Sequence, residues 1–314
     1  MREQSSPAGW ACLAAEPSVR GWRSTFRIGE VSLGLSGDGD HEPTFGDAPE
    51  LFRSEESFCD LEIMLQWENE LLSPPGRLRF DSGSVWKLYD DSVGATGDMV
   101  FDFSSSVIGP DPYKRLHVDC DFRRALLVLN RSYFPDPASC RPLDYPLDEL
   151  VVIHRLGRER GVEVHAAGMR DDDGNAYLFL GHSGAGKSTT TRLWNQQHSM
   201  TVLSDDRIIL RERDGEVWMH GTPWHGEAAF AAPEKARIDR LFVLEHAPQN
   251  RIFPLQGSRA VGEIMARSFL PFYDGAALEN TMSFLQEMVA TIPCYRLEFR
   301  PDGTAVDVVR GFRD

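Results

Sequence analysis

Eight residues in the middle of the chain match the pattern G-x-x-x-x-G-K-[ST] at every fixed position: Gly181-His-Ser-Gly-Ala-Gly-Lys187-Ser188. Glycines in this pattern let the backbone approach phosphate oxygens, and the N–H groups of the loop point at them. The lysine reaches the β- and γ-phosphates, and the serine hydroxyl binds Mg²⁺. The motif therefore predicts a site for ATP and Mg²⁺. The predicted nucleotide contacts are Gly181, His182, Ser183, Gly184, Ala185, Gly186, Lys187, Ser188 and Thr189.

Two consecutive carboxylates, Asp205 and Asp206, follow this motif after a short apolar run. An apolar strand that ends in aspartate beside a phosphate loop is the usual partner for magnesium. A pair offers more, because one carboxylate can hold the metal while the other accepts a proton from an attacking hydroxyl. The alternative is an ordinary acidic turn before Arg207.

The elements that must position these groups can also be predicted. Ala176–Leu180 is apolar throughout, as in a strand buried on both faces, and a helix is expected over Lys187–Gln197. Thr201–Ser204 is predicted as the next strand. A strand, helix and strand at this spacing form a βαβ unit, so we expect the two strands to be parallel neighbours. Gly181 and Asp205 would then lie at the carboxyl ends of these strands, where open α/β sheets bind ligands.

His165 is predicted to lie at the mouth of the loop. Val162–His165 alternates like a strand, and Asp171–Asn175 is rich in turn residues. Together with Ala176–Leu180 these segments predict a hairpin, in which paired residue numbers have a constant sum of 346 or 347. His165 is then opposite Gly181 or His182. A structural histidine is the alternative to a role near the transferring phosphate.

These features together resemble the catalytic core of the HPr kinase/phosphorylase family, which shares a phosphate-loop fold with the phosphoenolpyruvate carboxykinases. The resemblance rests on His165, on the loop 181–188 and on Leu203-Ser-Asp205-Asp206, and it extends over about residues 150–300. It is closest to the HPr-kinase-like proteins of gene clusters for modified peptides. It implies an α/β fold (α+β overall), with a P-loop kinase core of the HPr kinase/PEP carboxykinase type and a β-rich N-terminal domain.

The resemblance also implies catalytic roles. Asp205 would be the general base, His165 would tune Asp205 or contact the phosphate, and Lys187 would bind the β- and γ-phosphates. Ser188, Asp206 and Glu227 would form the metal site. The segment that contains Glu227, Gly221-Thr-Pro-Trp-His-Gly-Glu, is otherwise predicted as a tight turn.

We therefore predict an ATP- and Mg²⁺-dependent serine kinase. The expected acceptor is a serine of a peptide or protein, such as a precursor peptide, and a small-molecule hydroxyl acceptor stays an alternative. HPr is not expected as the acceptor, because the long glycine-rich signature and the C-terminal helices of the regulatory enzymes are not recognisable. A homo-oligomer is compatible with the resemblance. The rival hypotheses are a nucleotide-dependent switch or scaffold without an acceptor, and a carboxykinase-like enzyme.

Two domains are predicted. Residues 1–140 contain many short apolar runs separated by turn residues, which indicates a β-rich domain with a proposed role in substrate recognition. Within it, Gly34–Pro43 is predicted as loop. Residues 141–314 form the predicted catalytic domain, beginning with a helix near Leu147–Arg160. Near its end we predict a hairpin of Tyr295–Phe299 with Ala305–Val309.

Bulk composition excludes several classes of protein. The 314 residues are 41% hydrophobic, which is sufficient for real cores, and the net charge of −15 disfavours nucleic acid and anionic membranes as partners. No run approaches the roughly 18 apolar residues of a membrane span, and the N-terminal segment does not resemble a signal peptide. The five cysteines form no C-x-x-C pair, so neither disulfides nor zinc are indicated. We expect a cytoplasmic protein.

Overall fold

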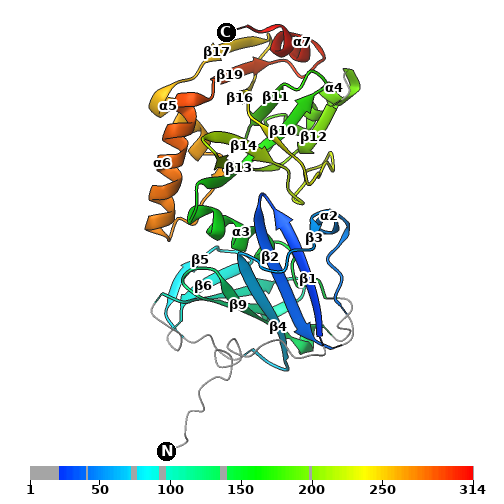
Figure 1. Ribbon diagram of the computed structural model, residues 1–314, viewed down its shortest axis with the longest axis vertical. Helices are drawn as coiled ribbons and strands as arrows, with labels where there is room; N and C mark the ends of the chain where they lie inside the picture. Colours follow the sequence, from blue (N-terminus) through cyan, green and yellow to red (C-terminus); the bar gives the residue numbers. More distant parts are fainter. Residues whose placement is uncertain are drawn as a thin grey trace, which may run out of the picture. The chain divides into compact units, whose positions relative to one another are not determined.

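The computed structural model describes residues 21–39, 42–71, 76–91, 97–134, 140–197 and 200–313 (Figure 1). Two compact units divide the chain. The first comprises the described residues up to Arg27 together with Val31–Arg155, and the second comprises Ile28–Glu30 and the chain from Leu156 onward. The two compact units meet between Arg155 and Leu156. The domain boundary predicted at 140/141 concerns domains that fold separately, and it stays a prediction.

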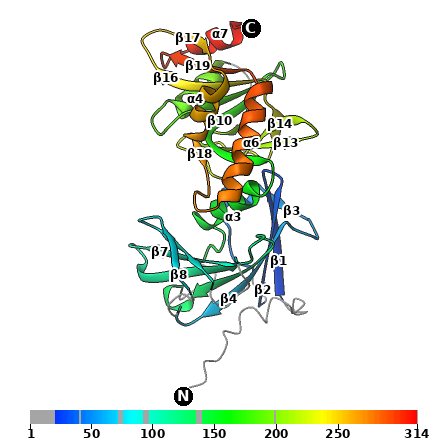
Figure 2. The same cartoon turned by 90° about the vertical axis from the view of Figure 1, so that its left-hand side faces the viewer.

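The described part of the first unit contains one sheet of nine strands. Its order is β3-β1-β2-β4-β9-β8-β7-β6-β5, in which β4 pairs parallel with both β2 and β9. The sheet is strongly curved, with β7 and β8 on one arm and β1 and β2 on the other (Figure 2). The strands are β1 (Gly21–Ile28), β2 (Val31–Asp38), β3 (Arg53–Ser54), β4 (Leu61–Glu68), β5 (Leu78–Asp81), β6 (Trp86–Asp90), β7 (Met99–Ser105), β8 (Gly109–Val118) and β9 (Arg124–Asn130).

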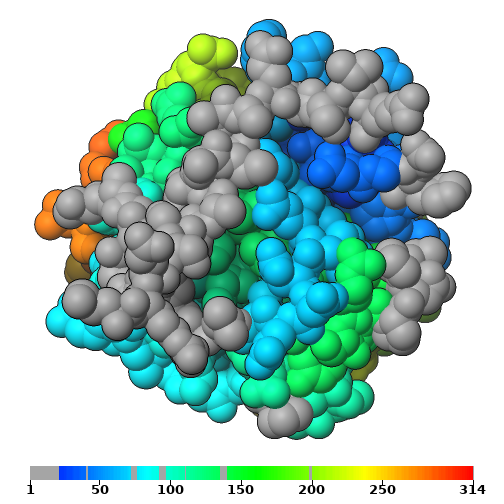
Figure 3. Space-filling view, turned by 90° about the horizontal axis from the view of Figure 1, so that it is seen from below, coloured from blue at the N-terminus to red at the C-terminus, as the bar shows by residue number. Residues whose placement is uncertain are grey.

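This unit is β-rich, as the sequence predicts. Three short helical segments accompany the sheet: α2 (Asp47–Glu50), the 3₁₀ turn η1 (Arg131–Tyr133) and α3 (Leu147–Gly157). Figure 3 shows a face of the unit on which atoms coloured blue to green, from the strands of this sheet, lie at the surface.

The loop predicted over Gly34–Pro43 is wrong at its start, because β2 continues to Asp38. Gly34 and Ser36 suggest a loop when read alone. Val31, Leu33 and Leu35, however, are almost fully buried and alternate along the strand. Pairing with β4 on one side and β1 on the other supplies the backbone hydrogen bonds that a local reading does not see.

The second unit contains a mixed sheet whose main path is β15-β14-β13-β10-β11-β16-β19-β17 among the described residues. Strands β11, β16 and β19 are parallel, and the other pairings on this path are antiparallel. The strands are β10 (Gly161–Asp171), β11 (Ala176–Leu180), β12 (Met200–Ser204), β13 (Arg207–Arg213), β14 (Glu216–His220), β15 (Lys235–Arg237), β16 (Arg240–His246), β17 (Arg251–Pro254), β18 (Ser268–Phe269) and β19 (Cys294–Phe299).

Helices cover both faces of this sheet. On one face, α5 (Gly257–Met265) and α6 (Gly275–Thr291) bury aliphatic side chains and Phe284. On the other, α4 (Lys187–Gln197) and α7 (Thr304–Gly311) pack on an aromatic cluster around Trp194 (Figure 1). The chain is thus a mixed α/β protein with mixed sheets and few helices.

The expected parallel neighbours, β11 and β12, do run in the same direction but are not neighbours. Strand β10 lies between them, because its residues 168–170 pair antiparallel with β11 on one side and β12 on the other. After β12 the chain forms β13, which also pairs with β10. Asp205 and Asp206 lie between β12 and β13, two strands with the same partner. The loop after β11 and the acidic pair consequently lie on either side of the middle of β10.

The predicted hairpin at the end of the chain is also wrong. β19 pairs with β16 and β17, and residues 304–311 form helix α7. The apolar positions Ala305, Val306 and Val309 have helical spacing, and all three are buried against the aromatic cluster. Asp302, in the turn before the helix, accepts hydrogen bonds from the N–H and hydroxyl of Thr304, the first residue of α7.

Among the described residues, no helix is both long and apolar enough to cross a membrane. Cys59, Cys120, Cys140 and Cys294 are free thiols. The fifth cysteine and the apolar segment near the N-terminus lie outside the described residues.

We predict that Trp194→Ala destabilises the second unit by about 3–5 kcal/mol. Trp194 is 1% exposed and packs on Tyr177 and Phe179, with ring centroids 5.0 and 5.9 Å away, so it anchors the helix that begins at Lys187. Urea unfolding followed by circular dichroism measures the loss. Trp218→Ala, a change at a half-buried tryptophan on β14, is the matched control and should cost much less. Equal losses would contradict the anchoring role.

Candidate functional site

The segment Gly181–Gly186 connects β11 directly to α4, which begins at Lys187. Gly184 and Gly186 have positive φ angles of 78° and 97°. A Cβ on Gly186 would also lie 2.5 Å from the ring of Phe299, so glycine is required there for two reasons. The turn is closed by a hydrogen bond from Ala185 N–H to the His182 carbonyl.

The predicted nucleotide contacts differ in exposure. His182, Ser183 and Gly184 are exposed, and Ala185, Gly186, Ser188 and Thr189 are partly buried. The positive charge of the neighbouring Arg267 lowers the pKa of His182, and burial lowers it further. The loop thus presents a polar, accessible surface at the carboxyl end of β11.

Lys187 is 6% exposed, although it carries an ammonium group. Its Nζ donates to the carbonyls of Gly181 (3.1 Å) and His182 (3.3 Å) and lies 2.7 Å from Nε2 of His165. Burial lowers the pKa of Lys187 to about 8, although the carboxylate of Asp206 opposes the shift. The ammonium is therefore held by neutral acceptors that an anionic ligand can replace.

His165 occupies the position that the hairpin register predicts. Gly181 N–H donates to the His165 carbonyl, which confirms a pairing sum of 346. The imidazole Nε2 lies 2.9 Å from Oδ1 of Asp206 as well as 2.7 Å from Lys187. One ring nitrogen can donate to the carboxylate or accept from the ammonium, and it cannot do both at once. His165 thus links Lys187 to Asp206.

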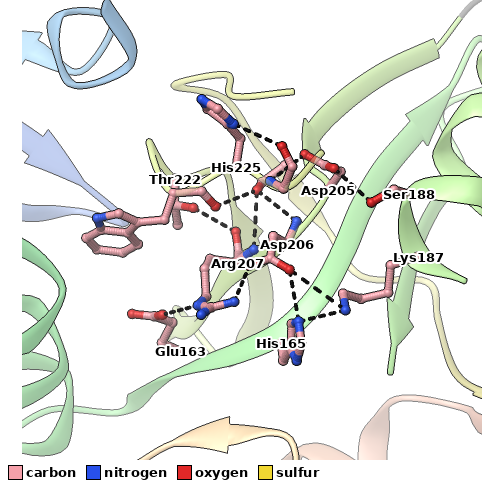
Figure 4. Close-up of polar contacts among 12 residues, drawn as sticks. Glu163, His165, Lys187, Ser188, Asp205, Asp206, Arg207, Thr222 and His225 are labelled. Carbon is pink, nitrogen blue, oxygen red and sulfur yellow. Dashed lines mark hydrogen bonds and ion pairs between the residues drawn. The ribbon is translucent and has the colours of Figure 1, made fainter. Parts of the chain in front are cut away.

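Asp205 is completely buried, and every direction around its carboxylate is occupied (Figure 4). The hydroxyl of Ser188 donates to Oδ2 at 3.1 Å. The backbone N–H groups of Gly226 and Ala228 donate at 2.9 Å, and that of Phe230 donates at 3.2 Å. A carboxylate offers about four acceptor positions, so these four donors satisfy it.

Asp206 has a different environment, since its side chain is 27% exposed. It is paired with His165 and Arg207, and Lys187 Nζ lies 3.8 Å away (Figure 4). Burial raises the pKa of Asp206, but the hydrogen bond from His165 and the charges of Arg207, His165 and Lys187 outweigh it and lower the pKa overall. Asp206 is thus an ionised carboxylate with an accessible edge.

The contacts of the segment Gly226–Phe230 were missed by the sequence analysis. Only its first two residues belong to the segment Gly221–Glu227, which was predicted as a tight turn or as the source of a metal ligand, Glu227. In the structure its alternate N–H groups enclose Asp205, and the Glu227 side chain is exposed without a contact to any described residue. Gly226 is the available signal, because a Cβ there would lie 2.8 Å from Oδ2 of Asp205.

Arg207 and its supports were also missed as site residues. The guanidinium donates to Asp206, lies 3.4 Å from the buried carboxylate of Glu163 and is 4.1 Å from the ring centroid of Phe269. Thr222 is buried and donates to the Arg207 carbonyl at 2.7 Å. An arginine directly after two aspartates was the only signal. Its position fixes the orientation of Asp206 from the side opposite His165.

The structure groups the predicted metal ligands differently from the sequence analysis. Ser188 contacts Asp205, Asp206 faces His165, and Glu227 is apart from both. Within the described ranges, no three His, Cys, Asp or Glu side chains are arranged to hold a metal ion. Mg²⁺ commonly binds through one or two carboxylates with substrate phosphates and water, so Ser188 and Asp205 form a suitable pair of oxygen ligands.

Comparisons with known proteins give similarities to solved structures only. No protein-family model matches the chain, and no curated protein matches it. Among solved structures, the Hpr(Ser) kinase/phosphatase from Coxiella burnetii is similar at 14% identity, with a TM-score of 0.27. The match covers 47% of this chain and 90% of that one. Because this score is low, we base the functional proposal on the residues of the site.

We predict that Gly226→Ala disrupts the site, because its new methyl group would lie 2.8 Å from the carboxylate of Asp205 and 3.2 Å from Cβ of Asp206. Tryptophan fluorescence and binding of a fluorescent ATP analogue measure the effect, and we expect at least tenfold weaker binding, equivalent to about 1.4 kcal/mol. Gly262→Ala in α5, where a Cβ meets nothing within 4 Å, is the control. Unchanged binding in Gly226→Ala would show that the enclosure of Asp205 does not matter.

Proposed function

We propose that this chain is an ATP- and Mg²⁺-dependent kinase that transfers a phosphoryl group to a hydroxyl, foremost a serine of a peptide or protein. One observation supports this proposal above all. Lys187 and Ser188 of α4, both aspartates of the junction between β12 and β13, and His165 of β10 converge around one point at the carboxyl end of β11 (Figure 4). Phosphoryl transfer requires such a set for positioning and charge stabilisation.

The loop fits the polyphosphate of a nucleotide. Its exposed backbone precedes an 11-residue helix, whose N-terminus carries partial positive charge. Lys187 would bind the β- and γ-phosphates, for which its ammonium would leave two carbonyls, His165 and the more distant carboxylate of Asp206. Once Lys187 moves, Nε2–H of His165 donates to Asp206 without competition. Nucleotide binding and orientation of the carboxylate are thereby coupled.

Ser188 and Asp205 fit magnesium, since a hydroxyl and a carboxylate oxygen lie 3.1 Å apart next to the lysine that would hold the phosphates. When bound, the metal would supply charge neutralisation on the phosphate oxygens. The three N–H groups of residues 226–230 hold the Asp205 carboxylate in a fixed orientation for this role.

Asp206 fits the role of general base better than Asp205 does. A base needs a free lone pair directed at the acceptor hydroxyl, and three backbone N–H groups and the Ser188 hydroxyl occupy those of Asp205. The one position that Ser188 can release is the position that a metal held by Ser188 and Asp205 would use. Asp206 keeps an exposed edge and is oriented by His165 and Arg207. We therefore propose Asp206 as the base and Asp205 as the metal ligand, the reverse of the roles that the sequence resemblance implies.

The first unit remains a candidate for acceptor recognition. Its curved sheet ends in the strands β3 and β5, each of which has one neighbour among the described strands. An extended peptide can add to such an edge through main-chain hydrogen bonds. This proposal keeps the role suggested for residues 1–140.

The deciding experiment compares Asp206→Asn with Asp205→Asn. We expect Asp206→Asn to lower kcat by about 10²–10⁴-fold with little change in nucleotide affinity, because only proton acceptance is removed. Asp205→Asn should instead weaken Mg²⁺-dependent nucleotide binding, because it removes a metal ligand. Transfer from γ-labelled ATP into peptides, a lysate and small hydroxyl compounds gives kcat, and calorimetry gives affinity.

Two outcomes would change the proposal. If Asp205→Asn abolishes transfer while nucleotide binding stays normal, the base is Asp205 and our assignment of the two carboxylates is reversed. If the wild type binds and slowly hydrolyses ATP without labelling any acceptor, the chain is a nucleotide-dependent switch.

A second prediction concerns pH. Because Lys187 has a pKa of about 8, its ammonium is lost as the pH rises above 8 in the free protein. Nucleotide affinity should therefore be constant below pH 7 and fall by up to about tenfold per pH unit above pH 8. Arginine stays charged throughout this range, so Lys187→Arg should lack the decrease. An identical profile in both proteins would exclude Lys187 as the titrating group.

A further inference from the structure

A pocket of about 230 Å³ lies beside the loop, within the second unit. Its floor is formed by the end of β16 and by Leu255, and its walls carry charged residues. The volume is below the roughly 300 Å³ at the lower end of sites for drug-sized ligands. The pocket thus suits a compound of a few carbon atoms. The charged lining consists of Arg259, Arg267, Arg296, Glu245 and Glu263.

Several contacts place this pocket next to the candidate site. β16 pairs parallel with β11 up to Val243 and Leu180, so the following residues of β16 run beside the loop. The carbonyl of Arg267 accepts a hydrogen bond from His165 N–H at 2.7 Å. The charge of Arg267 is also the main cause of the lowered pKa of His182 in the loop. A molecule in the pocket would therefore lie close to both the loop and His165.

The cations of the pocket are only partly neutralised. The side chain of Arg267 is nine-tenths buried, and Nη1 donates to the carboxylate and carbonyl of Glu263. Its Nε is buried and has no hydrogen-bond partner in the described structure. Arg296 lies 3.6 Å from Glu245 and 3.4 Å from Glu298, and Arg259 forms no ion pair with a described residue. The pocket therefore keeps unused cationic donors on Arg259 and on Nε of Arg267.

We propose that this pocket binds the acceptor, and that the acceptor is a small hydroxy acid or hydroxy amino acid whose carboxylate is held by Arg259 and Arg267. A buried guanidinium N–H without a partner is costly, and a carboxylate is the ligand whose two oxygens match the guanidinium fork. An α-ammonium group, where present, would face Glu245. The inference rests on the proposed kinase function and takes its small-molecule alternative as the acceptor, in place of the serine of a peptide or protein.

The reaction is balanced without a further reactant. The acceptor hydroxyl oxygen forms a bond to the γ-phosphorus of ATP, and the bond from that phosphorus to the β–γ bridging oxygen breaks. ADP leaves with the bond electrons, and the hydroxyl proton passes to Asp206. The anchored carboxylate would orient the hydroxyl for this attack.

The test uses the full chain with MgATP and four acceptors: L-serine, D-glycerate, L-serinamide and a peptide with an internal serine and blocked ends. We expect transfer to L-serine or D-glycerate and at least tenfold lower kcat/KM for L-serinamide, which lacks the carboxylate. Arg259→Ala should raise KM for the acid about tenfold or more, as expected for a lost charge-assisted hydrogen bond, and leave KM for ATP unchanged. Arg259→Ala should not change kcat/KM for L-serinamide. Phosphorus NMR identifies the product.

Arg251→Ala is the matched control, because it removes an exposed arginine whose side chain contacts only Gln249. Calorimetry of L-serine and D-glycerate with a non-hydrolysable ATP analogue tests binding independently of turnover. Arg267→Lys keeps the positive charge but loses the paired N–H donors of the guanidinium, and it should weaken this binding. Because this change is conservative, it tests Arg267 with little risk that the variant misfolds.

The outcomes separate this inference from the proposed function. Binding of an acid that is lost in Arg259→Ala, without any turnover, supports the pocket and overturns the kinase. Transfer to the blocked peptide that is insensitive to Arg259→Ala supports the kinase and overturns the pocket. A raised KM for ATP in Arg259→Ala would assign the pocket to the nucleotide, and absence of acid binding would overturn the inference as well.

Discussion

The buried carboxylate of Asp205 is the constraint on which the site depends. A charge without solvent is tolerated only if hydrogen bonds replace the lost water, and here the donors are Ser188 and three backbone N–H groups. These donors come from the start of α4 and from Gly226–Phe230. The hydrogen bonds to this one carboxylate therefore fix helix α4, the junction of β12 with β13 and the segment 226–230 relative to each other.

The two adjacent aspartates become chemically different because their surroundings differ. Asp205 is held by three fixed backbone N–H groups and by the Ser188 hydroxyl, and only this hydroxyl can rotate away to let a cation bind the carboxylate. Asp206 is surrounded by the titratable or charged groups His165, Lys187 and Arg207, and it keeps an exposed edge. Their electrostatic effect depends on where Lys187 points, so a polyphosphate that draws Lys187 away changes the basicity of Asp206.

Cationic side chains gather at this edge of the sheet, although the chain as a whole is acidic. The net charge is −15, and Lys187, Arg207, Arg259 and Arg267 lie around the loop and the neighbouring pocket, among the carboxylates of Asp206, Glu163 and Glu263. A small anion can contact these cations, while the acidic remainder repels polyanions such as nucleic acid. This distribution is consistent with small anionic ligands rather than with a long phosphate backbone.

Sequence alone determined the parts of this site whose physics is local. The loop 181–188, its flanking strand and helix, and the register that sets His165 opposite Gly181 follow from glycine spacing, apolar runs and hairpin arithmetic. Tertiary structure decided what depends on distant pairing. β10 separates β11 from β12, Asp205 receives the N–H groups of residues 226–230, and residues 304–311 form a helix instead of a strand. Periodicity within a segment cannot reveal which strand becomes its neighbour or which backbone donors reach a buried charge, because both depend on the packing of the whole sheet.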